Sequence, residues 1–208
     1  MLRRLRRQKR SRRQVLLARA AGPAAILGAA DQAVLRFLRT RAHGPVTEAA
    51  MKALGLAGEY GAVWMAIGLG AAAGDERRRL RWLAAAGAAP AAIVANYAVK
   101  RSIGRERPVI TEHPPLARAP SKLSFPSAHA TSSFAAAAAL GRVEPRASAP
   151  LHALATAIAV GRPYLGMHYP SDVLAGALLG AILGRLIPGL EEPPASSAQA
   201  AAPDRNLP

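Results

Sequence analysis

Cysteine is absent from the 208 residues of this chain, and aromatic residues make up only 4% of it. The first absence excludes disulfides, thiol catalysis and zinc sites built on cysteine. The second leaves Ala and Gly as the main apolar residues, and small side chains at helix contacts are typical of membrane bundles. The length is sufficient for one domain, or for one compact helical bundle with tails.

Acidic residues are also scarce: 12 Asp and Glu stand against 28 Lys and Arg, which gives a formal net charge of +16. A nucleic-acid-binding protein can carry such a charge, but its distribution here indicates another role. Eight of the first thirteen residues are Arg or Lys, and many of the others flank apolar runs. We expect this basic arm to be cytoplasmic and to contact anionic lipid headgroups. No nucleic-acid partner is expected.

Five apolar runs favour membrane helices: residues 60–73, 80–99, 127–140, 151–161 and 173–187. A weaker run at residues 15–30 contains Arg19 and is either a sixth span or an interfacial segment. A soluble bundle would need polar faces with a period of 3.6 residues, and residues 134–140 and 173–183 offer none. We therefore predict an all-α integral membrane bundle of about six transmembrane helices, with a weak first span.

The same pattern divides the chain into four segments. Residues 1–14 form the basic arm, and residues 15–58 combine the weak span with an amphipathic interfacial stretch near Val34–Arg39. The main membrane domain is expected at residues 59–188. Residues 189–208, which are rich in Pro, Ala and Ser, read as a disordered tail.

The distribution of arginine predicts the orientation of the bundle. The connection Gly74–Arg81 carries four arginines, which places it in the cytoplasm by the positive-inside rule. Counting spans from there puts residues 142–150 inside, and residues 100–126 and 162–170 outside. The first outer segment nevertheless holds several basic residues: Lys100, Arg101, Arg105, Arg107, Arg118 and Lys122. Positive charge on this side indicates a functional use, such as holding an anion.

Three polar clusters fall on the outer side, each at the end of an apolar run: Lys100–Pro108, Phe125–His129 and Arg162–Asp172. Lys100, Arg107 and Arg162 offer many hydrogen-bond donors and no acceptors, which suits a phosphate dianion and its transition state. Ser127 begins the expected helix that holds His129, and free backbone N–H groups at such an end also favour phosphate.

Two histidines in these clusters can divide the chemistry of phosphate transfer. One imidazole can attack phosphorus while the other protonates the leaving oxygen. Asp172 follows His168 by four residues and can accept the far N–H of that ring, which would orient its nucleophilic nitrogen. Pro170 marks the expected start of a helix with Asp172 in its first turn. Because no cluster of carboxylates is present to hold Mg²⁺, we expect neither a metal nor another cofactor.

The other polar residues on this side have simpler interpretations. Glu59 either lines the site or makes a contact at a helix end. Four basic residues are interpreted as membrane anchors or lipid-headgroup contacts: Arg101, Arg105, Arg118 and Lys122. Three histidines are interpreted as surface or packing residues: His43, His113 and His152.

Together the clusters resemble the signature of the type-2 phosphatidic-acid phosphatase superfamily. The family pattern is Lys-x6-Arg-Pro, then Pro-Ser-Gly-His, then Ser-Arg-x5-His-x3-Asp. This chain has Lys100-x6-Arg107-Pro108, Pro126-Ser127-Ala128-His129 and Gly161-Arg162-x5-His168-x3-Asp172. The resemblance covers about residues 59–187.

This resemblance implies a six-helix membrane fold with a haloperoxidase-like helical core, and catalysis without a metal. It implies that His168 forms a phosphohistidine supported by Asp172 and that His129 is the general acid. The phosphate would be held by four residues: Lys100, Arg107, Ser127 and Arg162. Two positions depart from the pattern. Ala128 replaces Gly, which should still permit close approach if its φ is not positive, and Gly161 replaces Ser, which removes one possible hydrogen bond to phosphate.

Residues 121–131 are similar to actinobacterial proteins proposed to dephosphorylate decaprenylphosphoryl-5-phosphoribose, a precursor of cell-wall arabinan. We therefore predict a lipid phosphate phosphatase of the plasma membrane with an extracytoplasmic site, and a polyprenyl-linked phosphosugar is one candidate substrate. Phosphatidate, phosphatidylglycerophosphate and undecaprenyl diphosphate are alternative substrates. The alternative from another class is a membrane protein that binds or transports phospholipid without turnover.

Overall fold

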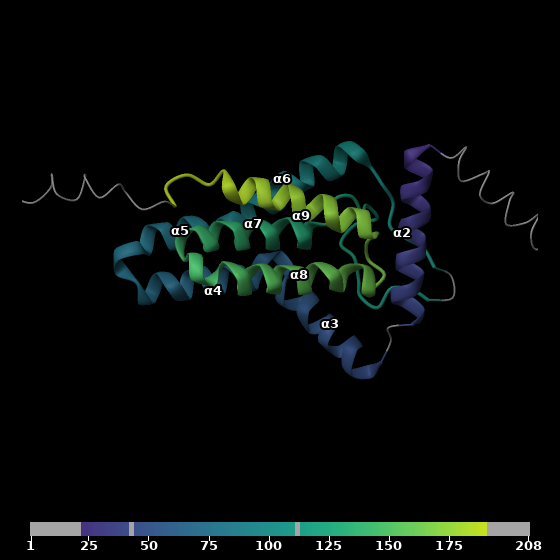
Figure 1. Cartoon of the computed structure of the whole chain (residues 1–208), viewed down its shortest axis with the longest axis horizontal. Coiled ribbons are helices and arrows are strands. Elements are labelled where there is room, and N and C mark those ends of the chain that lie inside the picture. The colour runs from purple at the N-terminus through teal and green to yellow at the C-terminus, as the bar shows by residue number, and fades with distance from the viewer. Residues whose placement is uncertain (1–21, 42–43, 111–112, 191–208) are drawn as a thin grey trace, which may run out of the picture.

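The computed structural model describes residues 22–41, 44–110 and 113–190, and its regular elements there are helices (Figure 1). The one extended pairing in these ranges is an isolated bridge between Glu106 and Leu123. The prediction of an all-α chain is thus confirmed for the described residues. The basic arm and residues 191–208 of the predicted tail lie outside them.

The bundle is built around one central helix, α7 (Ala128–Val143), which is buried along most of its length. It packs against five others: α4 (Ala62–Gly74), α5 (Arg79–Ala86), α6 (Ala88–Ile103), α8 (Ser148–Tyr164) and α9 (Pro170–Arg185). Each of these helices falls on an apolar run expected from the sequence. The core between them is formed mainly by alanines of α7 together with Trp64, Leu140 and Ile158.

Small residues bring α9 into direct contact with the backbone of α7. Gly176, Gly180 and Gly184 are spaced four apart on one face of α9. A Cβ atom added at Gly180 would lie 2.2 Å from the carbonyl oxygen of Thr131, and one at Gly184 would lie 2.2 Å from that of Ala135. Helices that pack this closely without bulky side chains follow the small-xxx-small pattern of membrane proteins.

Replacing Gly180 by alanine is therefore expected to force the two helices apart. Overpacking of this kind typically costs about 1–3 kcal/mol of unfolding free energy. The matched control is Gly70→Ala in α4, where no heavy atom lies within 4 Å of the added Cβ. That control should leave stability unchanged or raise it by about 0.4–1 kcal/mol. Thermal unfolding in detergent measures both, and a Gly180→Ala variant that melts at or above the wild-type temperature would contradict the packing argument.

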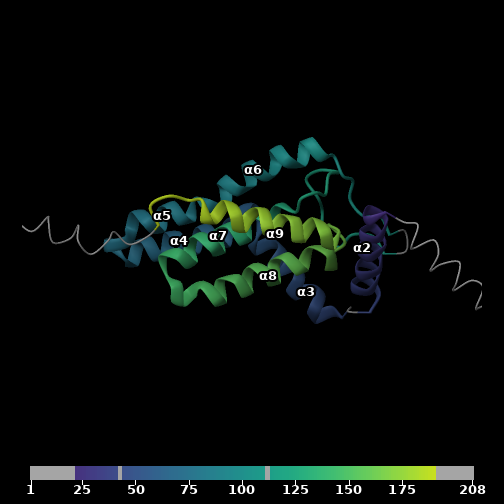
Figure 2. The same ribbon diagram turned by 45° about the horizontal axis from the view of Figure 1, so that its top comes forward.

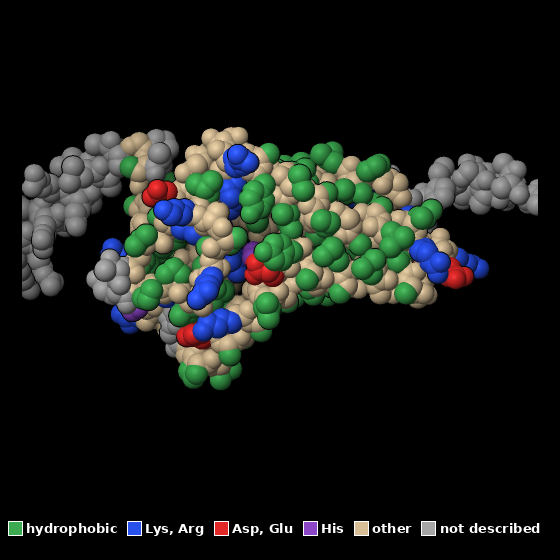
Figure 3. Space-filling view, turned by 180° about the vertical axis from the view of Figure 1, so that it is seen from behind, with side chains coloured by type: hydrophobic (Ala, Val, Ile, Leu, Met, Phe, Trp, Pro, Cys, Tyr) green, Lys and Arg blue, Asp and Glu red, His purple; other side chains and the backbone are tan. Residues whose placement is uncertain are grey.

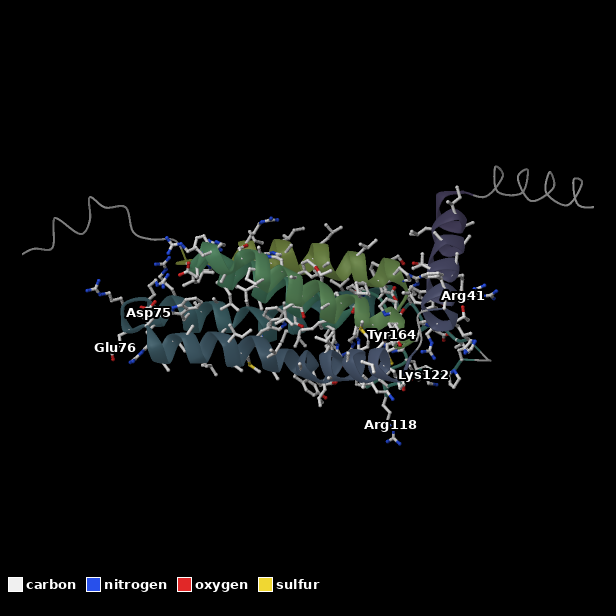
Figure 4. All side chains as sticks on the ribbon, turned by 60° about the horizontal axis from the view of Figure 1, so that its bottom comes forward. Arg41, Asp75, Glu76, Arg118, Lys122 and Tyr164 are labelled. Atoms are coloured by element: carbon white, nitrogen blue, oxygen red, sulfur yellow. The ribbon has the colours of Figure 1, made fainter. Side chains whose placement is uncertain are left out.

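Contacts between the connecting segments show which of these segments lie at the same end of the bundle. Arg78, in the turn between α4 and α5, pairs with Glu144 in the turn between α7 and α8 at 3.2 Å. Arg81 donates to the carbonyl oxygen of Leu190, after α9, at 2.6 Å. Figure 4 shows Asp75 and Glu76 at this end, and Arg118, Lys122 and Tyr164 at the other. The grouping of loops expected from charge is therefore confirmed, because the three polar clusters share the second end.

The sides of the bundle between these ends are largely apolar. Figure 3 shows one face on which Lys, Arg, Asp and Glu gather toward the two ends, with hydrophobic side chains and backbone between them. Among the described residues, the helix Glu76–Ile103 is long and apolar enough to cross a membrane. The pair Pro45–Ala57 and Glu59–Gly74, bent by 51°, passes the same test as one unit.

The predicted number of about six spans is not confirmed. The helices α7 and α9 have 16 residues each and α8 has 17. At 1.5 Å per residue they are about 24–26 Å long, which is shorter than the roughly 30 Å hydrocarbon core of a bilayer.

Two further helices frame the end that carries the polar clusters. Helix α2 (Pro23–Thr40) lies crosswise over this end of the bundle in both Figure 1 and Figure 2, and it contacts α8 and α9. Helix α3 (Pro45–Ala57) leads into α4 through a kink at Tyr60, whose φ is 51°. Residues 15–21 of the predicted weak span lie outside the described residues, and residues 23–30 belong to α2. The span therefore stays a prediction.

Candidate active site

The three polar clusters converge on one pocket at the end of the bundle. Five of the seven predicted site residues line it: Lys100, Arg107, His129, Arg162 and His168. They come from α6, from the segment that follows it, from the first turn of α7, from the last turn of α8 and from the α8–α9 connection. The other two, Ser127 and Asp172, are fully buried and are not among the lining residues.

His168 lies in the wall of the pocket, and only 2% of its surface is exposed. Its Nε2 lies 3.2 Å from Nη1 of Arg107. A guanidinium can only donate, so Nε2 is the acceptor and the proton of the neutral ring is assigned to Nδ1. Nδ1 lies 3.6 Å from Oδ2 of Asp172, which is beyond hydrogen-bond range. The lone pair of Nε2 therefore faces a cation, while Nδ1 faces a carboxylate.

Asp172 is held in place by the start of α9. The helix begins at Pro170, as the sequence predicts, with Tyr169 as its N-cap. Oδ2 of Asp172 accepts the backbone N–H of Tyr169 at 2.8 Å, which fixes the carboxylate at the third helical position. The backbone oxygen of Asp172 accepts the N–H of Ser127 at 3.0 Å. This bond ties the starts of α7 and α9 together beneath the pocket.

Four cations line the pocket: Lys100, Arg107, Arg162 and Arg118, the last of which was interpreted as a membrane anchor. The hydrogen-bond partners of the three predicted phosphate-binding cations are neutral. Lys100 Nζ lies 3.4 Å from the carbonyl oxygen of Ser124. Arg107 donates to the carbonyl oxygens of Ser121 at 2.8 Å and Met167 at 2.6 Å. Arg162 is 5% exposed, and its Nε is buried without a partner among the described residues. Because carbonyl groups do not neutralise these charges, the pocket attracts an anion.

His129 sits at the start of α7, one residue into the helix that Ser127 caps. Its Nε2 lies 3.1 Å from the carbonyl oxygen of Gly55. A carbonyl only accepts, so Nε2 carries a proton and Nδ1 is the nitrogen that remains for other chemistry.

Ala128 does not have positive φ, since Tyr60 is the one non-glycine residue with such a φ in the described part of the chain. Ala128 can therefore stand in place of the Gly of the family pattern without backbone strain.

The burial of His168 gives a testable dependence of stability on pH. Burial lowers the pKa of His168 to about 3, and Arg107 and Arg162 lower it as well, although Asp172 opposes them. An unfolded histidine has a pKa near 6.5, so between these values the unfolded chain binds more protons than the folded one. Stability should therefore fall as pH drops below about 6.5, by up to about 1.4 kcal/mol per pH unit from this group. Melting temperatures measured at pH 7, 6 and 5 test this: a His168→Gln variant should show a shallower slope, and equal slopes would contradict the assignment.

The structure also contains partners that the sequence did not indicate. Arg105 was interpreted as a membrane anchor, and this is wrong, because it pairs with Asp172 and with Asp31 at 2.8 Å each. Its position two residues before Arg107 was the one feature of the sequence that could have assigned Arg105 to the site. Asp31 precedes Arg105 by 74 residues, and no motif connects them. Glu59 lines the pocket, which decides between its two interpretations in favour of the site.

A scan of family models matches residues 80–191 to the PAP2 superfamily. The chain belongs to this superfamily. It is 42% identical over 134 residues to decaprenylphosphoryl-5-phosphoribose phosphatase of Mycobacterium tuberculosis, an alignment that covers 62% of this chain and 72% of the relative. It is 41% identical over 128 residues to the protein of the same name from Mycolicibacterium smegmatis, with 60% and 68% covered. Among solved structures it resembles a transmembrane PAP2-type phosphatidylglycerolphosphate phosphatase from Bacillus subtilis, with a TM-score of 0.64, 24% identity, and 84% and 89% of the two chains covered.

Membership in the PAP2 superfamily makes this chain a phosphoric ester hydrolase. The likeness to the Bacillus subtilis structure shows a shared fold, and that protein is a transmembrane one. The resemblance drawn from three short motifs is thereby confirmed over a longer stretch of sequence and over the helical architecture.

Proposed function

We propose that this PAP2 phosphatase removes phosphate from a membrane lipid through a phosphohistidine formed on His168. The observation that supports this best is the position of its Nε2. The lone pair of this nitrogen points to a wall of the pocket that also carries Lys100, Arg107 and Arg162. A phosphate group held by these cations would meet the nucleophile directly.

In the first step of the proposed reaction, Nε2 of His168 attacks phosphorus, the N–P bond forms and the P–O bond to the lipid breaks. In the reacting complex His129 also carries a proton on Nδ1, and it gives this proton to the leaving oxygen. The lipid leaves as an alcohol, or as a monophosphate when the substrate is a diphosphate. Arg107 bonds the same lone pair at 3.2 Å. Phosphate oxygens would draw this guanidinium to themselves, and substrate binding would thus free the nucleophile.

In the second step, water attacks phosphorus from the side opposite to the N–P bond. His129 now takes the proton of the water, the N–P bond breaks, and inorganic phosphate leaves while His168 returns to its neutral form. Asp172 stabilises the ring, which is positively charged while Nε2 carries the phosphoryl group and Nδ1 keeps its proton. Ser127, which is buried beside the start of α9, contributes through the N-terminus of α7 rather than by facing the pocket.

For the substrate we propose a polyprenyl-linked phosphosugar, because the two curated relatives at 41–42% identity are named for decaprenylphosphoryl-5-phosphoribose. The pocket continues from the cations to Ile93, Tyr97 and Pro120, which offer apolar contact. Phosphatidate, phosphatidylglycerophosphate and undecaprenyl diphosphate are the alternatives to compare with it.

We further propose a plasma-membrane location with the pocket on the extracytoplasmic face. The connection Gly74–Arg81 carries four arginines, and its residues Asp75 and Glu76 lie at the end opposite the pocket (Figure 4), which supports this orientation. In the same proposal residues 59–188 form the catalytic membrane domain, and residues 1–14 contact anionic lipid on the cytoplasmic side.

Phosphate release from a lipid panel tests the proposed function. Purified protein should release inorganic phosphate from at least one of the four substrate classes, and the rate should be unchanged by EDTA, because the groups that face the phosphate are cations of the chain itself. Vanadate should inhibit. Strict dependence on a divalent metal would contradict the mechanism. Retained lipid affinity without turnover on the whole panel would favour a binding protein instead.

A further inference from the structure

A cluster of five residues lies directly behind the candidate nucleophile. Arg105, in the segment after α6, donates from Nη1 to Oδ1 of Asp172 at 2.8 Å and from Nη2 to Oδ2 of Asp31 at 2.8 Å. The same guanidinium bonds Ser171 Oγ at 2.7 Å. Its carbon atom lies 4.1 Å from the centre of the Tyr169 ring. The fork of Arg105 is thus fixed in both position and plane.

Asp31 completes this cluster from the crosswise helix α2. It is 3% exposed, and its Oδ1 accepts the backbone N–H of Ser171 at 2.8 Å. Asp31 therefore bonds the residue next to Asp172 and the guanidinium that holds Asp172. This arrangement connects a helix near the N-terminus of the described chain to the start of α9.

We propose that Asp31 and Arg105 are positioning residues for the Asp172–His168 pair, an inference that rests on the proposed function. Arg105 occupies Oδ1 of Asp172, and the N–H of Tyr169 bonds Oδ2. These two bonds fix the carboxylate plane so that Oδ2 faces Nδ1 of His168. A carboxylate fixed 3.6 Å from Nδ1 favours the tautomer with its proton on Nδ1 and its lone pair on Nε2.

Asp31 also adjusts the charge that His168 meets. One guanidinium between two carboxylates leaves a net charge of −1 in the Asp31–Arg105–Asp172 group. If Asp31 were neutral, Arg105 would offset the charge of Asp172 alone, and the group would no longer favour a positively charged ring. The phosphorylated ring of His168 carries that positive charge. Asp31 thereby acts through Arg105 and Asp172 on the step that forms the phosphohistidine.

The test compares Asp31→Asn and Arg105→Gln with the control Ser171→Ala, which removes hydrogen bonds from the same cluster but no charge. Both charge variants should lower kcat by about 10- to 100-fold, as outer residues of a catalytic group typically do. KM should stay within about twofold, because neither residue lines the pocket. Ser171→Ala should keep more than about half of the wild-type kcat, because the direct bonds of Arg105 to Asp172 and to Asp31 remain. Arg105→Lys, which keeps the charge and loses the fork, should fall between wild type and Arg105→Gln.

A readout independent of turnover separates this proposal from the proposed function. In protein labelled with [15N]histidine, the signal that disappears in His168→Gln belongs to His168. The wild type should show its Nδ1–H tautomer, and Arg105→Gln should show a mixture of both tautomers. An inactive wild type would remove the proposed function but leave this comparison intact. Wild-type kcat and an unchanged tautomer in Arg105→Gln would overturn the positioning role, and so would a loss in Ser171→Ala equal to that in Asp31→Asn.

Discussion

Replacing His168 by alanine is expected to lower phosphate release by about 10³-fold or more, because the variant lacks the imidazole that would form the covalent intermediate. The affinity for the lipid should change little, since Lys100, Arg107 and Arg162 still surround the phosphate. Initial rates over a range of substrate concentration, together with binding of radiolabelled lipid, measure the two effects separately.

The matched control for this substitution is His152→Ala. His152 lies in α8, bonds the carbonyl oxygen of Ser148 and packs against Phe134, away from the pocket. Its removal should leave kcat within about twofold of the wild type, because it touches no group of the site. A His168→Ala variant that hydrolyses lipid at a rate near that of this control would remove His168 from the mechanism.

The Arg162→Met substitution should lower activity without lowering the stability of the fold. Arg162 is nearly fully buried, and its Nε has no partner among the described residues. A donor placed for the charge of the transition state typically contributes about 2.7–4 kcal/mol, so kcat should fall by about 10²- to 10³-fold. A buried guanidinium whose Nε lacks a partner destabilises the fold, so an apolar side chain of similar length should keep or raise the melting temperature.

Rate and melting temperature are measured on the same preparation, with Arg101→Met as the control on the same side of the bundle. Arg101 is exposed and does not line the pocket. Phosphate or vanadate should raise the melting temperature of the wild type and of Arg101→Met but not that of Arg162→Met. A change confined to KM in Arg162→Met would assign this residue to substrate binding rather than to the transition state.

The sequence was sufficient for most of the pocket because spacing and helix ends determine it. Pro170 and Asp172 define the start of α9 by local rules, and Ser127 defines the start of α7 in the same way. Charge on the connecting segments then predicted which loops share an end, and the contacts of Arg78 and Arg81 confirm it.

What the sequence did not predict depends on contacts between distant segments. The Asp31–Arg105 pair requires α2 to lie across the end of the bundle, and no periodicity in residues 22–41 specifies that direction. The bond between His129 and Gly55 depends on the path of α3, and it uses a backbone oxygen that any residue supplies. The sequence also did not predict how short α7, α8 and α9 are, because apolar side chains occur both where a helix is buried in protein and where it faces lipid.

The central claim, a phosphohistidine on His168, is tested most directly by trapping the intermediate. The enzyme is mixed with lipid substrate that carries 32P in the scissile phosphate, quenched in alkali, digested and analysed by mass spectrometry. The account predicts an acid-labile phosphoryl group on the peptide that contains His168, which disappears in a chase with unlabelled substrate and is absent from His168→Ala. Rapid turnover with no such adduct, or with an adduct that survives acid, would contradict it.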